Sequence, residues 1–143
     1  MLKDQLSRLY RLFRLLHYRK LFGQIREKDG SLSATEAFAA DVIFLLDEPT
    51  VTRLADTLGI SQPNATYKVN NLTAKGYVVK SSSGDDRREC HLQVSEKFHN
   101  YYDTSDAFLQ PALEKLRSRY TEEELALFES MLRSLNEAVE SEE

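Results

Sequence analysis

The segment LADTLGISQPNATYKVNNLTAKGYV, from Leu54 to Val78, constrains the fold more than any other part of the chain. Gly59 follows a short helical pattern and supplies the left-handed backbone conformation that ends many helices. Ser61 is placed to cap the next helix, and Pro63 lies in its first turn, where a missing backbone N–H costs nothing. We therefore expect two short helices, 53–58 and 62–75, joined by a tight turn.

The apolar residues of this segment have the spacing that helix packing requires. Intervals of four and three residues put Ala65, Val69 and Leu72 on one face of the second helix. Thr50 or Thr52 can cap the first helix, and Gly76 closes the second. The outward face of the second helix is then left with polar side chains.

The hydrophobic period changes after Gly76. Residues 77–81 and 89–94 read as strands, because Tyr77 and Val79, and then Cys90, Leu92 and Val94, alternate at a period of two. The loop between them, SSGDDRREC at 82–90, brings two acids against two arginines. We expect a β-hairpin with this charged loop at its tip.

Helical patterns flank the central segment on both sides. Residues 3–28 carry a broad apolar stripe, and Ser33 with Glu36 forms a capping box that opens a helix over 34–46. Ser95 can cap a long helix through Leu116, which Pro111 should kink or restart. Thr121 and Glu124 form a second capping box before a final helix.

Composition excludes several functional classes. The chain has 143 residues, of which 41% are hydrophobic, enough for one compact domain or for one domain with dimerisation arms. Its one cysteine, Cys90, excludes an intramolecular disulfide and favours a reducing cytoplasm. No apolar run is long enough to span a membrane. His17, His91 and His99 lack metal-ligand spacing, and no catalytic cluster or phosphate-binding loop is present, so we expect no enzyme activity, metal or cofactor.

Two helices joined by a tight turn and followed by a hairpin predict a mainly α protein (α+β), a winged helix-turn-helix with a helical dimerisation region from both chain ends. The second helix would present polar groups to base edges in the major groove of double-stranded DNA. Its candidate contacts are Ser61, Gln62, Pro63, Asn64, Thr66, Tyr67, Lys68 and Asn71. Thr50, Thr52, Lys75 and Lys80 are candidates for phosphate contacts. The alternative is that these polar side chains merely solvate an exposed helix.

The loop at the tip of the hairpin is also a candidate for DNA binding. A narrow minor groove concentrates negative potential and attracts arginine, and a neighbouring carboxylate can hold the guanidinium ready. Asp86, Arg87 and Arg88 are therefore candidate DNA contacts. The alternative is a solvated tip whose charges only keep the protein in solution.

From about Phe38 to Lys97 the sequence resembles the MarR family of bacterial transcription regulators. The resemblance lies in LADTLGIS, in Leu72 followed by GYV at 76–78, and in DRR followed by a strand ending in VSEK. The flanking helices agree with that family in number and order, so the resemblance extends over essentially the whole chain. Phe98 stands where the family usually has glycine, and Tyr67 where it often has arginine. The resemblance implies that Asp86 orients Arg88 in the minor groove, although sequence does not separate Arg88 from Arg87.

The resemblance also implies a homodimeric repressor in a bacterial or archaeal cytoplasm. It would bind a pseudo-palindromic operator and be relieved by a small-molecule effector. The apolar stripes near both ends are too wide for one chain to bury, which independently favours a dimer. We expect dimerisation helices at 1–33 and 99–143 around a DNA-binding domain at 34–98. A ligand cleft of His17, Tyr18, Phe38, Phe44, Tyr101 and Tyr102 is implied, with ordinary core aromatics as the alternative. A second functional class stays open, a winged-helix adaptor module that binds protein and has no operator of its own.

Overall fold

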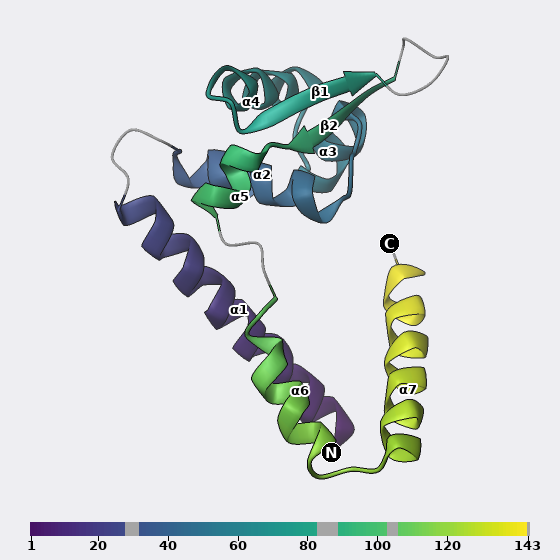
Figure 1. Cartoon of the computed structure of the whole chain (residues 1–143). Helices are drawn as coiled ribbons and strands as arrows, with labels where there is room; N and C mark the ends of the chain where they lie inside the picture. The colour runs from purple at the N-terminus through teal and green to yellow at the C-terminus, as the bar shows by residue number, and fades with distance from the viewer. Residues whose placement is uncertain (28–31, 83–88, 103–105, 143) are drawn as a thin grey trace. The chain divides into compact units, whose positions relative to one another are not determined.

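The computed structural model describes residues 1–27, 32–82, 89–102 and 106–142. The chain divides into two compact units, Met1–Asp103 and Thr104–Glu143. The first unit contains five helices and one hairpin among its described residues, and the second contains two helices (Figure 1). The domain limit expected after residue 98 falls inside the last helix of the first unit.

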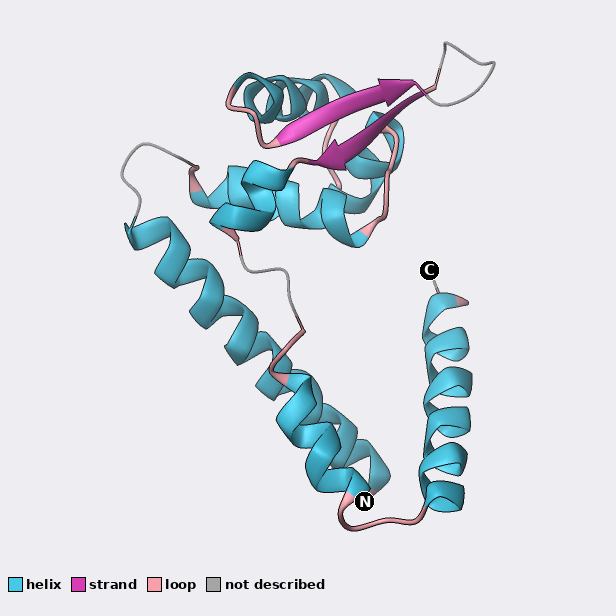
Figure 2. Ribbon diagram, in the orientation of Figure 1, coloured by secondary structure: helices cyan, strands magenta, loops and turns pink. Residues whose placement is uncertain are grey.

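The first unit is a helical layer beside one antiparallel hairpin (Figure 2). Its elements are α1 (Leu2–Glu27), α2 (Ala34–Leu45), α3 (Val51–Leu58), α4 (Gln62–Ala74), β1 (Val78–Ser82), β2 (Cys90–Val94) and α5 (Glu96–Tyr101). The mainly helical fold with a small sheet confirms the expected winged helix-turn-helix.

The helix boundaries follow from the capping residues that the sequence indicated. Ser33 and Glu36 form the complete capping box of α2, and Thr50, not Thr52, caps α3. Gly59 ends α3 in the left-handed conformation, at φ 65°, which glycine adopts without steric cost. Ser61 then caps α4 by accepting a hydrogen bond from the backbone N–H of Asn64.

The hairpin pairs Val78 with Val94, Lys80 with Leu92 and Ser82 with Cys90. Residues directly opposite each other share one face of an antiparallel pair. Val78 and Leu92 are fully buried on that face, whereas Val79 is 50% exposed. The strand expected from Tyr77 begins instead at Val78, and Tyr77 enters the core from the turn before it.

One continuous core lies among α2, α3, α4, the hairpin and α5. Its largest fully buried side chains include Leu54, Leu72, Leu92 and Phe98. The Phe98 ring stacks on Tyr102 at 5.5 Å between centroids and an interplanar angle of 23°. Phe98 is thus a core residue of α5, four positions after the end of β2.

The expected long helix after Ser95 was wrong. α5 ends at Tyr101, and Tyr102 is extended, with φ −119° and ψ 117°. A new helix, α6 (Leu109–Arg117), places Pro111 in its first turn, where no intrahelical N–H bond is lost. The proline therefore marks a restart, one of the two outcomes that the sequence allowed.

The second unit pairs α6 with α7 (Glu122–Glu140). Thr121 and Glu124 form the predicted capping box of α7. Neither helix has a buried residue, and α7 exposes an apolar stripe of Leu127, Phe128, Met131, Leu132, Leu135 and Val139. An open groove of about 560 Å³ runs between the helices and is lined mostly by apolar side chains such as Leu113, Leu116 and Leu132. We call this stripe and groove the α6–α7 apolar surface.

Candidate nucleic-acid interface

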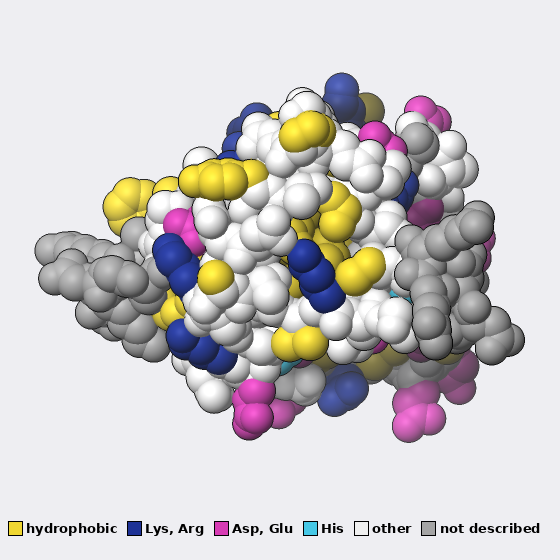
Figure 3. Space-filling view, turned by 90° about the horizontal axis from the view of Figure 1, so that it is seen from above, with side chains coloured by type: hydrophobic (Ala, Val, Ile, Leu, Met, Phe, Trp, Pro, Cys, Tyr) yellow, Lys and Arg dark blue, Asp and Glu magenta, His cyan; other side chains and the backbone are white. Residues whose placement is uncertain are grey.

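The outward face of α4 carries the polar residues expected to contact DNA. Ala65, Val69 and Leu72 are buried, so the rest of the helix faces solvent. Gln62, Pro63, Asn64, Thr66 and Tyr67 are exposed, and Lys68 and Asn71 are half-buried at the edges. Seen from above, the surface over α4 and β1 is mostly uncharged, with scattered cationic and apolar side chains (Figure 3). Such a surface can offer hydrogen-bond donors and acceptors to base edges.

The start of α4 is fixed by its capping turn. The backbone N–H of Ile60 donates to the carbonyl of Ala55, and that of Ala65 donates to the carbonyl of Ser61. Because the Ser61 hydroxyl accepts the N–H of Asn64, the first turn of α4 is held in place by its own cap. Gln62 and Asn64 therefore project from a rigid segment.

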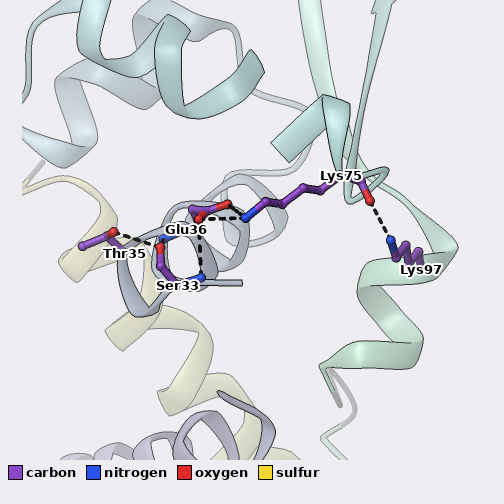
Figure 4. A network of polar contacts seen from close by, with 5 residues as sticks. All are labelled: Ser33, Thr35, Glu36, Lys75 and Lys97. Atoms are coloured by element: carbon purple, nitrogen blue, oxygen red, sulfur yellow. Dashed lines mark hydrogen bonds and ion pairs between the residues drawn. The ribbon is translucent and has the colours of Figure 1, made fainter. Parts of the chain in front are cut away.

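The other end of α4 is tied to α2 and α5 by a polar network (Figure 4). Lys75 Nζ contacts both carboxylate oxygens of Glu36, at 2.8 and 3.1 Å. Lys97 Nζ donates to the carbonyl of Lys75 at 2.7 Å and lies over the Tyr77 ring. The pKa of Glu36 lies below its usual range: partial burial acts to raise it, but hydrogen bonds from Lys75 and Ser33 outweigh that effect.

This network changes how Lys75 can act. Its ammonium is already neutralised by Glu36, so a DNA phosphate would have to compete for it. Thr50 uses its hydroxyl oxygen to cap α3 but keeps its proton for donation, and Thr52 is exposed at the start of the same helix. Lys75 therefore remains a predicted phosphate contact, but the Glu36 carboxylate competes with the phosphate for its ammonium.

The hairpin is anchored to the turn between α2 and α3. Leu92 N–H donates to the carbonyl of Pro49, and His91 Nδ1 lies 2.9 Å from the carbonyl oxygen of Glu48. The side chain of Gln93 also donates to the Glu48 carboxylate. Asp47 and Glu48 both adopt positive φ, 54° and 59°, which brings this turn against β2.

The predicted wing contacts Asp86, Arg87 and Arg88 lie outside the described residues. β1 and β2 lead into that loop from a paired and anchored base. Cys90 is half-buried on β2, consistent with a packing role.

Sequence reasoning missed one polar contact on this surface. Lys80 Nζ on β1 donates to Asn70 Oδ1 on α4 at 2.8 Å. The sequence predicts Asn71 and not Asn70 as a DNA contact, but in the structure Asn70 is exposed and Asn71 is half-buried. Asn70 follows Thr66 by four residues and Tyr67 by three, and residues at these intervals share one face of a helix. This spacing is the signal that could have identified Asn70.

Of the six aromatic and histidine residues expected in a ligand cleft, three lie together and three lie elsewhere in the first unit. His17, Tyr18 and Tyr102 lie together, with Tyr102 Oη 3.0 Å from His17 Nδ1. Phe44 packs on His99, whereas Tyr101 packs on Tyr77. Tyr101 and Tyr102 are core residues, and Phe38 is 41% exposed on α2.

Asp41 extends the His17 group into the protein interior. It is the one buried charged residue among the described positions, and its carboxylate lies 3.6 Å from His17 Nε2. Burial raises the pKa of Asp41, and the facing His17 offsets this only in part. The folded state therefore holds the Asp41 proton more tightly than the unfolded state does.

We expect the Asp41→Asn variant to gain stability relative to the wild type as pH rises. A raised pKa in the folded state means that Asp41 opposes folding once the unfolded chain ionises. The wild type should lose stability from the ordinary aspartate pKa up to the raised one. Urea unfolding of both proteins between pH 4 and 7.5 measures this, and a constant difference across that range would contradict it.

These elements define the class of protein, a winged helix-turn-helix protein with additional helices before and after the winged helix. Residues 42–89 match the model of the MarR family. The transcriptional repressor MprA of Escherichia coli strain K12 is 38% identical over 50 residues, which are 35% of this chain and 28% of that protein. The chain thus matches less than a third of the length of this curated relative.

Solved structures extend the likeness in fold to almost the whole chain. Streptococcus pneumoniae FabT in complex with DNA aligns over 100% of both chains, with a TM-score of 0.58 and 24% identity. The regulator Tm0710 from Thermotoga maritima aligns over 96% of each, with a TM-score of 0.57 and 19% identity. A MarR mutant from E. coli complexed with operator DNA gives a TM-score of 0.52 and 19% identity over 92% of this chain and 93% of its own.

Two further findings concern the described residues. None of their helices is long and apolar enough to cross a membrane. Within the same ranges, no group of three or more His, Cys, Asp or Glu side chains is arranged to hold a metal ion.

Proposed function

We propose that this protein binds double-stranded DNA and regulates transcription, acting as a repressor. The observation that carries the proposal is the exposed polar face of α4, held rigidly at both ends beside an anchored hairpin. The match of residues 42–89 to the MarR family model supports it. So do the similar proteins: MprA is a transcriptional repressor, and FabT and a MarR mutant form complexes with DNA.

In this proposal α4 enters the major groove and the hairpin follows the adjacent backbone. Gln62 and Asn64, in the first turn, are placed to meet base edges, and Thr66 and Tyr67 continue the same exposed surface. Thr50, Thr52 and Lys80 contact phosphates. At the wing tip, Arg88 or Arg87 enters the minor groove and Asp86 orients it.

The protein acts as a homodimer on a pseudo-palindromic operator. The α6–α7 apolar surface supports this, because Phe128, Met131 and Leu132 are each at least 37% exposed on one stripe of α7. α1 adds exposed apolar side chains, among them Tyr10, Leu15 and Phe22. A twofold partner would cover these surfaces and supply the second α4 for the other half-site, about one DNA turn away.

A small-molecule effector relieves binding in this proposal. His17, Tyr18 and Tyr102 support its placement between α1 and the end of α5, because they combine polar atoms with aromatic surface. The adaptor alternative, a winged helix that binds only protein, makes the opposite prediction about DNA. It predicts that the protein shows no salt-dependent binding to operator fragments.

The experiment is selection of genomic fragments with purified protein, followed by affinity measurements at 50 and 200 mM salt. We expect operator affinity to fall by roughly 10³-fold over that range, because several phosphate contacts release counterions. Asn64→Ala should reduce the preference for operator over unrelated DNA by roughly 5- to 150-fold. Asn100→Ala, on the exposed side of α5, is the matched control and should leave that preference unchanged.

The wing is tested in the same assay. Arg88→Ala should weaken operator binding while the unfolding transition stays unchanged, and Arg87→Ala shows which arginine matters more. Unchanged affinity in both would remove the wing from the proposal. Absence of salt-dependent DNA binding by the wild type would favour the adaptor alternative.

A further inference from the structure

Lys80 and Asn70 join the hairpin to the helix proposed to read DNA. Lys80 lies opposite Leu92 in the strand register, on the hairpin face that supplies Val78 and Leu92 to the core. Its backbone is therefore fixed by the core, while its ammonium reaches solvent beside α4. There it donates to Asn70 Oδ1 at 2.8 Å.

The chemistry of lysine settles which way the Asn70 amide is turned. An ammonium has three donors and no acceptor, so it can bond only to the oxygen of a carboxamide. Reversing the amide would place its NH₂ group against a positive charge. A hydrogen bond with an ionised partner is also stronger than a neutral one, so Lys80 favours one orientation of the Asn70 amide.

That orientation decides what Asn70 can recognise. Asparagine pairs with adenine through two bonds, one that it accepts at Oδ1 and one that it donates from Nδ2. Lys80 occupies one lone pair of Oδ1. An adenine N6–H could reach only the second lone pair, beside a positively charged ammonium that repels it, whereas the Nδ2 donors stay available. The remaining donors of Lys80 lie beside them, so Lys80 and Asn70 together form a site in which hydrogen-bond donors predominate. We call it the Lys80–Asn70 corner.

We propose that Asn70 contacts DNA and that Lys80 is its positioning residue, so that this corner selects a hydrogen-bond acceptor and disfavours the adenine pairing. The inference rests on the proposed function. The acceptor comes from one of two sources, the O6 and N7 atoms of guanine or a phosphate oxygen. Asn70 shares the exposed face of α4 with Tyr67, which supports its approach to the groove.

The test is selection from a randomised operator library, with affinities measured at several salt concentrations. Wild type, Asn70→Ala, Lys80→Met and the double variant are compared. Lys80→Met should free Oδ1 and raise the preference for adenine at one base position by about three- to tenfold. That gain should vanish in the double variant, because it requires Asn70. Lys80→Arg keeps charged donors and should retain the wild-type preference.

The two sources of the acceptor give different results for Asn70→Ala. A guanine contact predicts a loss of guanine preference at one position with the salt dependence unchanged. A phosphate contact predicts weaker binding to all sequences with base preferences unchanged. Lys115→Met, in α6, matches the charge change of Lys80→Met and should alter no base preference.

Three results would overturn the inference. The first is a wild type that already prefers adenine at a position where Asn70→Ala removes that preference. The second is an Asn70→Ala variant that equals wild type in both base preference and salt dependence. The third is a gain in adenine preference on Lys80→Met that persists in the double variant. Each leaves the proposed function intact, provided that wild type still selects an operator. A wild type that binds no DNA overturns both.

Discussion

Phe98→Ala should lower the free energy of unfolding by about 3–5 kcal/mol, the largest effect we expect from a single substitution. The ring is fully buried and stacks on Tyr102, so its removal leaves a cavity at the junction of β2 and α5. The loss should lower the melting temperature by more than about 10 °C, since each kcal/mol shifts a unit of about 100 residues by about 4–8 °C. Thermal and urea unfolding measure both quantities.

Two controls separate packing from function. Phe98→Leu keeps most of the buried volume and should cost less than half as much as the alanine variant. Tyr67→Ala removes an aromatic ring that is 66% exposed and should change stability by less than about 0.5 kcal/mol while weakening DNA binding. An alanine variant at Phe98 within about 1 kcal/mol of wild type would mean that this junction does not hold the winged helix together.

The second large effect concerns self-association. Replacing Leu132 and Leu135 together by aspartate should raise the dimer dissociation constant by about 10³-fold or more. Each leucine lost from an interface forfeits about 1.5–3 kcal/mol, and each carboxylate placed there adds a desolvation cost. Light scattering or sedimentation at micromolar concentration measures the change from dimer to monomer.

A matched control lies on the same helix. Ser130→Asp with Ser134→Asp adds the same two charges to exposed positions outside the apolar stripe of α7, so the dimer should persist. The monomeric variant should also lose most of its operator affinity, because two half-sites would no longer be bound together. A wild type that is already monomeric at these concentrations would contradict the proposed homodimer.

The winged helix itself could be predicted closely because its signals are local. Ser33, Thr50, Ser61 and Thr121 each cap a helix as expected, and Gly59 has the predicted left-handed conformation. Caps and glycine turns depend on residues three or four positions apart, so they can be read without tertiary structure.

The failures arose where distant contacts decide the outcome. The apolar pattern placed the start of the first strand at Tyr77, but pairing with the second strand begins at Val78, opposite Val94. The helix α5 ends at Tyr101, and the next residue, Tyr102, is extended and stacks on Phe98. Within the candidate interface, the ion pair of Lys75 with Glu36 joins residues 39 positions apart, and no local pattern indicates it.

The way α4 is supported has an evolutionary consequence. Its inward residues, its cap and its C-terminal ion pair hold the helix in place, whereas Gln62, Asn64, Thr66 and Tyr67 have no role in the core. Substitutions at these four positions should therefore cost little stability. Under the proposed function, a descendant of this protein could acquire a different target sequence in single steps, while the scaffold that presents those side chains stayed unchanged.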